Sequence, residues 1–292
     1  MPGRAEKNPA DIVLRARLRE TVHFPDLTER LALRLSSIAA YTAQAHFGIW
    51  HKKLGSPDFT KPNAVFTPLV YVELEATDAR VDPREPFRVH GETFLAKTLG
   101  ADGGVRHLLR EGRHTVMRPD KTVVARAHLV NVFTRYHADA ARRRVTELPP
   151  EMGIGSTPSR VTALVDLATL LPADRRPDFV EQTTRVWHYG QTDANRHVNG
   201  MEYLRSMELY VADVLHAGGH DLRRLYFTRA RIVYRKPCFR GEGYRCQAWL
   251  QGESPLTIVG AFVKIDDGPG ARPAAAVELT LGQHDGATSS RS

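Results

Sequence analysis

The residues most suited to chemistry lie in one short polar run, in which Asp193, Asn195 and His197 alternate. An imidazole can move a proton near neutral pH, a carboxylate can act as base or nucleophile, and an amide can hold a water or a carbonyl. If the run is extended, alternate side chains point the same way and the three converge. The spacing predicts an acid–base or nucleophilic site. Turn and helix-capping roles explain the same residue types equally well.

The run ends where an amphipathic helix is expected to begin, close to Val198, Asn199 and Gly200. The start of a helix leaves backbone N–H groups without partners and carries a partial positive charge. Such a place can stabilise an oxyanion that develops on a substrate carbonyl. The sequence thus combines acid–base groups with a candidate oxyanion site.

Two expected helices, each followed by strands, would position these groups. The first helix is expected over residues 31–54 and the second over 201–216, and glycines follow both. The expected strands are 65–75, 87–99, 105–118 and 123–136 in the first half, and 225–235, 244–252, 257–266 and 274–283 in the second. The first 20 residues are polar and are expected to be frayed or weakly helical. The repeated order predicts an α+β protein in which each half wraps an antiparallel sheet around one helix.

Composition excludes several classes of protein. The chain has 292 residues, a formal net charge of +8 and two cysteines, which cannot form a disulfide framework and favour a reducing cytoplasm. No apolar run approaches the roughly 20 residues of a membrane helix, and the start lacks the apolar stretch of a secretory signal. The basic residues lack the interleaved aromatic residues of a nucleic-acid surface. We expect a cytoplasmic protein with no membrane, nucleic acid, metal or cofactor.

The segment from Asp193 to Tyr203 resembles the D-x-N-x-H-V-N-N-x-x-Y signature of hot-dog thioesterases, especially the acyl-ACP thioesterases. Weaker similarity to that family extends over 31–55, 120–150 and 233–238. The resemblance implies a tandem double hot-dog. Its domains would be 20–147, which sets acyl-chain specificity and lacks the catalytic triad, a linker at 148–180, and 181–284, which carries the active site.

In that family the Asp, Asn and His are catalytic, which implies these roles for Asp193, Asn195 and His197. Two positions depart from the family pattern: Pro237 stands where the family has a catalytic Glu, and Gly200 replaces the second Asn. Three groups could assist the triad in place of that Glu: Glu208, Glu242 and Cys238. For Cys238, a packing role is the alternative.

The resemblance implies a thioesterase that hydrolyses an acyl-ACP or acyl-CoA in fatty-acid or polyketide metabolism. Because the family's Glu is missing, two alternatives stay open: a non-hydrolytic enzyme of polyketide biosynthesis, either acyltransferase or dehydratase, and a non-catalytic acyl-binding protein. The acyl chain is expected in an apolar tunnel shaped partly by the first helix, with Phe47, Ile49 and Trp50.

The partners implied are an acyl carrier protein or acyl-CoA, and the chain could form a homodimer of double hot-dogs. A carrier's phosphate could bind to Arg229, Arg231 and Arg235, although a solvated sheet face is the alternative. The run 142–144 is interpreted as a solvated edge. Matching the glycines after the two helices places Arg30, Ala32 and Arg34 opposite the triad, so one site per chain is expected.

Overall fold

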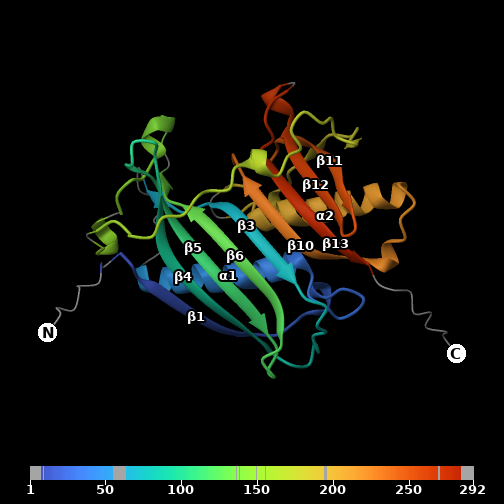
Figure 1. The fold of residues 1–292 in the computed structure, drawn as a ribbon, viewed down its shortest axis with the longest axis horizontal. Coiled ribbons are helices and arrows are strands. Elements are labelled where there is room, and N and C mark those ends of the chain that lie inside the picture. The colour runs from blue at the N-terminus through green and yellow to red at the C-terminus, as the bar shows by residue number, and fades with distance from the viewer. Residues whose placement is uncertain are drawn as a thin grey trace.

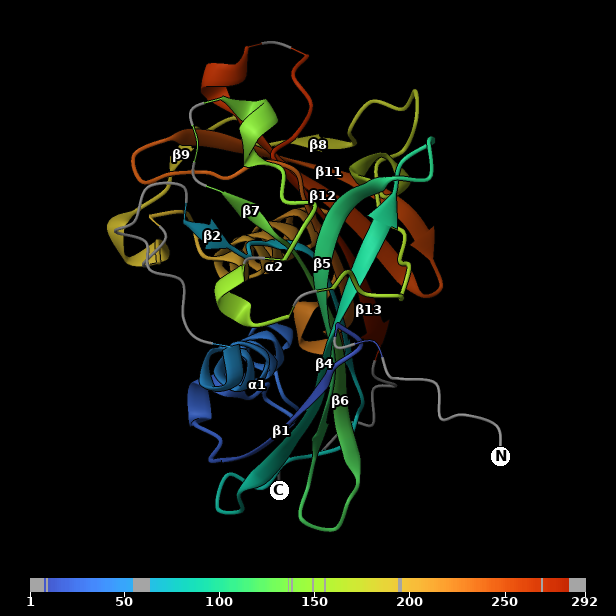
Figure 2. The same ribbon diagram turned by 90° about the vertical axis from the view of Figure 1, so that its left-hand side faces the viewer.

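The computed structural model describes residues 8, 10–54, 64–135, 137, 139–148, 150–154, 156–193, 196–268 and 270–283. Within them, one eleven-stranded sheet packs against two long helices, α1 (Leu35–Leu54) and α2 (Gly200–Ala217), which both lie behind it in Figure 1. Figure 2 shows α1 beside β1 and β4 of the first half. No helix among the described residues has the length and apolarity to cross a membrane.

The main strands of the sheet are all antiparallel. In the first half they are β1 (Val13–Glu20), β3 (Leu69–Ala76), β4 (Phe87–Leu99), β5 (Val105–Met117) and β6 (Val123–Val132). In the second they are β10 (Leu225–Tyr234), β11 (Gly243–Glu253), β12 (Leu256–Lys264) and β13 (Ala275–Gln283), with the short β8 (Phe179–Val180) and β9 (Arg185–Val186). The small strands β2 (Val65–Phe66) and β7 (Thr134–Arg135) pair separately.

The strand order is β1-β4-β5-β6-β3-β10-β13-β12-β11-β8, and β9 also pairs with β11. The order on one side of the β3–β10 pair therefore mirrors the order on the other. That pair runs from Glu75 opposite Arg229 to Tyr71 opposite Val233. Main-chain hydrogen bonds thus join the two helix-and-sheet units into one sheet.

The largest buried cluster lies between the sheet and the two helices. Alternate residues of each strand face it: on β10, Ala230 and Ile232 point inward, whereas Val233 belongs to a smaller cluster on the outer face. This alternation follows from the two-residue period of a strand. It fixes which polar residues of each strand can reach the space beneath the helices.

The structure corrects the expectation for the first 20 residues and shows where the segment expected as a linker lies. Residues 13–20 form a full strand paired with β4, so the first unit begins before residue 20. The described residues of the segment expected as a linker, 148–180, contact the sheet. The Lys97 N–H of β4 donates to the Arg160 carbonyl, and the Thr162 N–H donates to the Lys97 carbonyl. Leu167 and Leu170 pack on the outer face of the sheet. Apolar residues on that face need cover from water, and this segment provides it.

Helix α1 begins four residues later than expected. Leu31 has a left-handed backbone (φ 63°), and the chain before the helix closes into a turn in which Leu27 and Leu33 form a β-bridge. A left-handed residue with an L side chain is incompatible with a continuing right-handed helix. The turn before α1 continues the apolar spacing of the helix. The spacing alone therefore cannot show where the helix begins.

Candidate active site

The polar run that contains Asp193 and His197 forms a closed turn at the start of α2. Thr192 and Val198 form a β-bridge, and the Asp193 N–H donates to the His197 carbonyl at 3.0 Å. Arg196 adopts a left-handed backbone (φ 62°), and its N–H donates to the Asp193 carbonyl at 2.9 Å. Asp193 and His197 are thus brought together as the two ends of a turn rather than by alternation along an extended chain. Asn195 lies outside the described residues.

The His197 side chain is half-buried between two aromatic rings. Its ring centroid lies 5.0 Å from that of Phe239 and 6.3 Å from that of Phe66, which belongs to the first half. Burial lowers the pKa of His197, and the negative charge of Asp193 partly opposes this shift. A neutral imidazole at neutral pH is the form that can accept a proton.

Most of the candidate oxyanion donors are already engaged. The Val198 N–H donates to the Cys238 carbonyl at 2.9 Å, and the Asn199 N–H donates to the Gln191 carbonyl at 2.8 Å. The Asn199 side chain caps α2 by accepting from the Met201 N–H at 2.9 Å. Within the described part of the chain, the N–H of Gly200 makes no hydrogen bond. Of the three residues expected to supply a donor, Gly200 alone retains a backbone N–H for a ligand.

The surroundings of Gly200 explain the departure from the signature at this position. The Tyr234 hydroxyl donates to the Gly200 carbonyl at 2.8 Å. A Cβ at this position would lie 3.1 Å from that hydroxyl and 3.2 Å from Cδ1 of Leu69. The close approach of Tyr234 and Leu69 therefore favours glycine and holds the first residue of α2 in place.

Cys238 and Glu242 both support the segment around His197. Cys238 is fully buried, and burial raises the pKa of its thiol, which disfavours the nucleophilic thiolate. The Glu242 carboxylate accepts from the Phe239 N–H at 2.8 Å and from Lys264 Nζ at 2.6 Å. It holds the turn that places Phe239 against His197.

Glu208 is not brought to this site. It lies eight residues after Gly200, about 12 Å along the axis of α2 at 1.5 Å per residue. Burial raises its pKa to about 7, opposed mainly by Arg34 from the chain before α1. Glu208 therefore belongs to the contact between the two halves.

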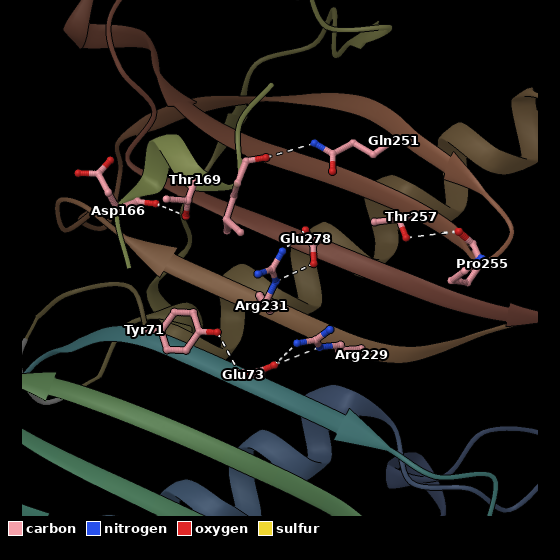
Figure 3. A network of polar contacts seen from close by, with 11 residues as sticks. Tyr71, Glu73, Asp166, Thr169, Arg229, Arg231, Gln251, Pro255, Thr257 and Glu278 are labelled. Atoms are coloured by element: carbon pink, nitrogen blue, oxygen red, sulfur yellow. Dashed lines mark hydrogen bonds and ion pairs between the residues drawn. The ribbon is translucent and has the colours of Figure 1, made fainter. Parts of the chain in front are cut away.

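The three arginines expected to form a phosphate platform are already engaged by groups of the protein. Arg229 pairs with Glu73 across the junction of the halves, and Arg231 pairs with Glu278 on β13, both on the outer sheet face shown in Figure 3. Arg235 donates to the carbonyls of Pro273 and Arg272.

A different basic cluster is linked to the candidate site through the β2–β7 pair. Arg135, His137, Arg142 and Arg144 line a cavity of about 490 Å³. Arg135 belongs to β7, which pairs with the strand that carries Phe66, and Phe66 contacts the ring of His197. We refer to these four residues as the β7 basic cluster. The sequence run 142–144 suggested a solvated edge, because nothing local indicates that β7 lies beside two of its members.

The first half repeats the turn without its reactive side chains. Leu27 and Leu33 form the same β-bridge, the Thr28 N–H donates to the Ala32 carbonyl at 2.8 Å, and Leu31 is left-handed as Arg196 is. Thr28 and Ala32 therefore stand opposite Asp193 and His197, and Arg30 has the sequence position that matches Asn195. The register expected from the glycines is wrong by two residues, because α1 has 20 residues and α2 has 18.

No protein-family model matches the chain, and no curated protein sequence matches it. Solved structures are similar over nearly the whole chain. A Lactobacillus plantarum protein proposed to be an oleoyl thioesterase has a TM-score of 0.65 and 14% identity, covering 96% of this chain and 100% of its own. The 12:0-ACP thioesterase from Umbellularia californica has a TM-score of 0.64 and 13% identity, covering 93% and 98%. A MaoC-like dehydratase from Phytophthora capsici has a TM-score of 0.52 and 14% identity, covering 96% and 98%.

These similarities define the class of architecture. The expected fold is confirmed: the chain is an α+β double hot-dog, with a long helix against an antiparallel sheet in each half. At this level of identity the similarity establishes the fold, and the activity has to be argued from the site.

Proposed function

We propose that the chain hydrolyses an acyl thioester at the turn that carries Asp193 and His197. The observation that supports this most is the combination of a half-buried imidazole of lowered pKa, a neighbouring carboxylate and a Gly200 N–H left for a ligand. Hydrolysis of a thioester needs a base for water, a stabiliser for the resulting imidazolium and a donor for the oxyanion. The turn offers one group for each task.

In the proposed reaction, the thioester carbonyl accepts a hydrogen bond from the Gly200 N–H. His197 removes a proton from a water molecule, and the water oxygen forms a bond to the carbonyl carbon. The tetrahedral intermediate then collapses, its C–S bond breaks, and the departing thiolate takes the proton from the imidazolium. Asp193 stabilises that imidazolium, and Asn195, by resemblance, orients the water or the carbonyl. Direct attack by Asp193 would instead leave an acyl-enzyme.

The carrier of the acyl group is proposed to be an acyl carrier protein or coenzyme A. Both present a phosphate beyond the pantetheine arm, and the β7 basic cluster lies one strand pair from Phe66 and His197. Arginine groups there can bind a phosphate with charge-assisted hydrogen bonds. Arg229, Arg231 and Arg235 would first have to give up their present partners, as would Arg142, which pairs with Asp139 at 3.8 Å.

A panel of acyl-ACP and acyl-CoA thioesters with detection of released thiol tests the activity. We expect thiol release without a trapped acyl-enzyme by mass spectrometry. Loss of water from a 3-hydroxyacyl thioester without thiol release would instead indicate a dehydratase, and transfer to a second acceptor an acyltransferase. Binding without any turnover would contradict the proposal and indicate an acyl-binding protein.

The phosphate site is tested by Arg144→Gln, with Arg229→Gln as the matched control. One charge-assisted hydrogen bond contributes about 1.5–3 kcal/mol, so Arg144→Gln should raise KM at least about 10-fold with little change in kcat. The Arg229→Gln variant should retain the wild-type KM. A raised KM for Arg229→Gln with a wild-type KM for Arg144→Gln would instead indicate that the phosphate binds on the outer sheet face.

A further inference from the structure

The space between α1 and the sheet of the first half contains a buried cation, Arg110, to which the described residues offer no hydrogen-bond acceptor. Arg110 of β5 is fully buried, and its Nε, Nη1 and Nη2 atoms make no hydrogen bond within the described residues. Its guanidinium carbon lies 4.4 Å from the ring centroid of Phe47 and 5.1 Å from that of Trp50, both on α1. These ring contacts attract a cation but leave all its N–H donors unsatisfied.

The polar side chains around Arg110 are a hydrogen-bonded group that provides no negative charge. His46 of α1 bonds Thr93 at 3.1 Å through Nδ1 and Asn131 at 2.8 Å through Nε2. His114 lies on the same strand face as Arg110, two positions beyond Gly112. Its Nε2 lies 3.3 Å from His46 Nδ1, and its Nδ1 has no hydrogen-bond partner among the described residues. We call Arg110, His46, His114, Thr93 and Asn131 the α1 polar cluster.

The charges of the cluster do not balance. Burial lowers the pKa of Arg110 to about 9 and that of His114 to about 4, and it lowers the pKa of His46 well below its usual range. At neutral pH the arginine is therefore charged and the two imidazoles are neutral. The neighbouring Glu111 points to the other face of β5, where it lies 3.4 Å from His128. Among the described residues, no carboxylate forms an ion pair with Arg110.

Two glycines show that the cluster is built into the sheet. A Cβ at Gly91 would lie 2.1 Å from His114 Nδ1, and a Cβ at Gly112 would lie 2.1 Å from His46 Nδ1. Glycine inside a strand weakens it, and it is used where another group approaches the backbone closely. The first-half sheet therefore accommodates both imidazoles at positions where any other residue would exclude them.

The α1 polar cluster is connected to the candidate active site. Asn131 Nδ2 donates to the Thr67 carbonyl at 2.7 Å, and the preceding residue, Phe66, lies against His197. Phe47 and Trp50, which were expected to line the acyl tunnel, hold the Arg110 guanidinium between them and the sheet. An acyl group that extends from His197 past Phe66 would approach this cation.

An uncompensated charge inside a protein is strongly unfavourable, and proteins normally pair it. We propose that Arg110 binds a carboxylate carried by the acyl group, so that the substrates are carboxyacyl thioesters rather than simple hydrocarbon ones. A planar carboxylate matches the guanidinium with two parallel hydrogen bonds, and the rings of Phe47 and Trp50 suit the methylene chain before it. The carrier's phosphate is excluded as this ligand, because it lies on the other side of the thioester. This inference rests on the proposed function for its substrate, but not for its binding site.

Matched pairs of substrates test the inference: hexanoyl-CoA against adipoyl-CoA, and octanoyl-CoA against suberoyl-CoA. For at least one pair, the carboxyacyl member should have the higher kcat/KM, by about 10- to 100-fold, the value of a charge-assisted hydrogen bond. The Arg110→Met variant should lose or reverse this preference. Arg113→Met, which changes an exposed arginine of the same strand, is the control and should keep it. A wild-type preference for the methyl-ended members at both lengths would overturn the inference.

Two measurements without turnover separate this inference from the proposed function. Suberate should raise the Tm of the wild type and of Arg113→Met, but not that of Arg110→Met. Octanamide, which has no carboxylate, should raise the Tm of the first two less than suberate does. Without ligand, Arg110→Met should raise the Tm, because it replaces an unpaired buried cation by an apolar side chain. A lower Tm for ligand-free Arg110→Met would show that the fold itself satisfies Arg110, and the inference would fail. Arg110-dependent suberate binding without hydrolysis of any thioester would contradict the proposed function alone.

Discussion

The two halves of the molecule share a backbone design and differ in where their polar groups lie. The second half has Asp193 and His197 in its turn, and aromatic rings fill its interior. The ring of Trp187 stacks on that of Tyr244, with 4.1 Å between the ring centroids, and also contacts Phe262. The first half has an unreactive turn, and its interior holds the α1 polar cluster. The same fold thus places a polar turn at the start of the helix in one half and a buried polar cluster beneath the helix in the other.

The glycines beneath the helices sharpen this contrast. In each half, the third strand from the β3–β10 junction has a glycine that faces the helix: Gly112 under His46 and Gly260 under Met207. A Cβ would lie 2.1 Å from His46 Nδ1 in the first case and 2.1 Å from Met207 Sδ in the second. The imidazole is held by hydrogen bonds, whereas a methionine can adopt another rotamer.

The largest effect should come from replacing side chains in the turn that carries Asp193 and His197. Asp193→Asn and His197→Ala should each lower kcat about 10²- to 10⁴-fold, the usual contribution of acid–base groups, with the fold intact by circular dichroism. Arg30→Ala changes the matching turn of the first half and should leave kcat unchanged. Asp193→Asn with wild-type activity would break the assignment of chemistry to the second half.

The two strand glycines should differ in what an added methyl group costs. Overpacking a core costs about 1–3 kcal/mol, and we expect Gly112→Ala at the upper end, because His46 cannot move without breaking its bonds to Thr93 and Asn131. Gly260→Ala should cost about 1 kcal/mol. Urea unfolding of both variants measures the difference, and equal losses would show that the first-half interior is no more rigid than the second.

The smallest effect concerns Glu208, at the contact between the halves. Its folded-state pKa of about 7 lies above the ordinary value of 4.5, so the folded state binds the extra proton. The stability linked to this proton is fully present below about pH 4.5 and is lost as the pH rises through about 7. Glu208→Gln should therefore be more stable than the wild type by about 1–3 kcal/mol at pH 8, and about equal to it near pH 4. Thermal unfolding at the two pH values tests this, and a difference that is independent of pH would contradict it.

Local patterns predicted most of the elements. The strand expected at 87–99 is β4, and the helix expected at 201–216 is α2 with one residue added at each end. Strand β1 was missed because its exposed positions carry Arg15, Arg17 and Arg19, which made the segment look merely polar. Its inward residues recur at every second position, so the two-residue period of a strand was present although the outward residues are charged.

The sequence motif carries the candidate site only as far as its residue types. The motif identified Asp193 and His197, but which backbone N–H remains for a ligand depends on Gln191 and Cys238, which accept the other two. Arg110 could not be recognised, because it stands in a charged stretch between Leu109 and Glu111. Arg110 is buried because its side chain points to the inner face of β5 and α1 packs over it. Both features depend on the tertiary structure. One repeated sequence pattern could have aligned the two turns correctly. His23-Phe24 and His188-Tyr189 each begin a capped 3₁₀ turn just before them.

The pairing of β3 with β10 makes each half dependent on the other. A separated second half would expose the unpaired N–H and C=O groups of β10, which can recruit another copy and so lead to aggregation or an unnatural dimer. It would also remove Phe66 from the ring of His197, and with it part of the burial that lowers the pKa of this histidine. Separating the halves would therefore expose the edge of β10 and remove part of the burial of His197, so the candidate site depends on both halves being present in one chain.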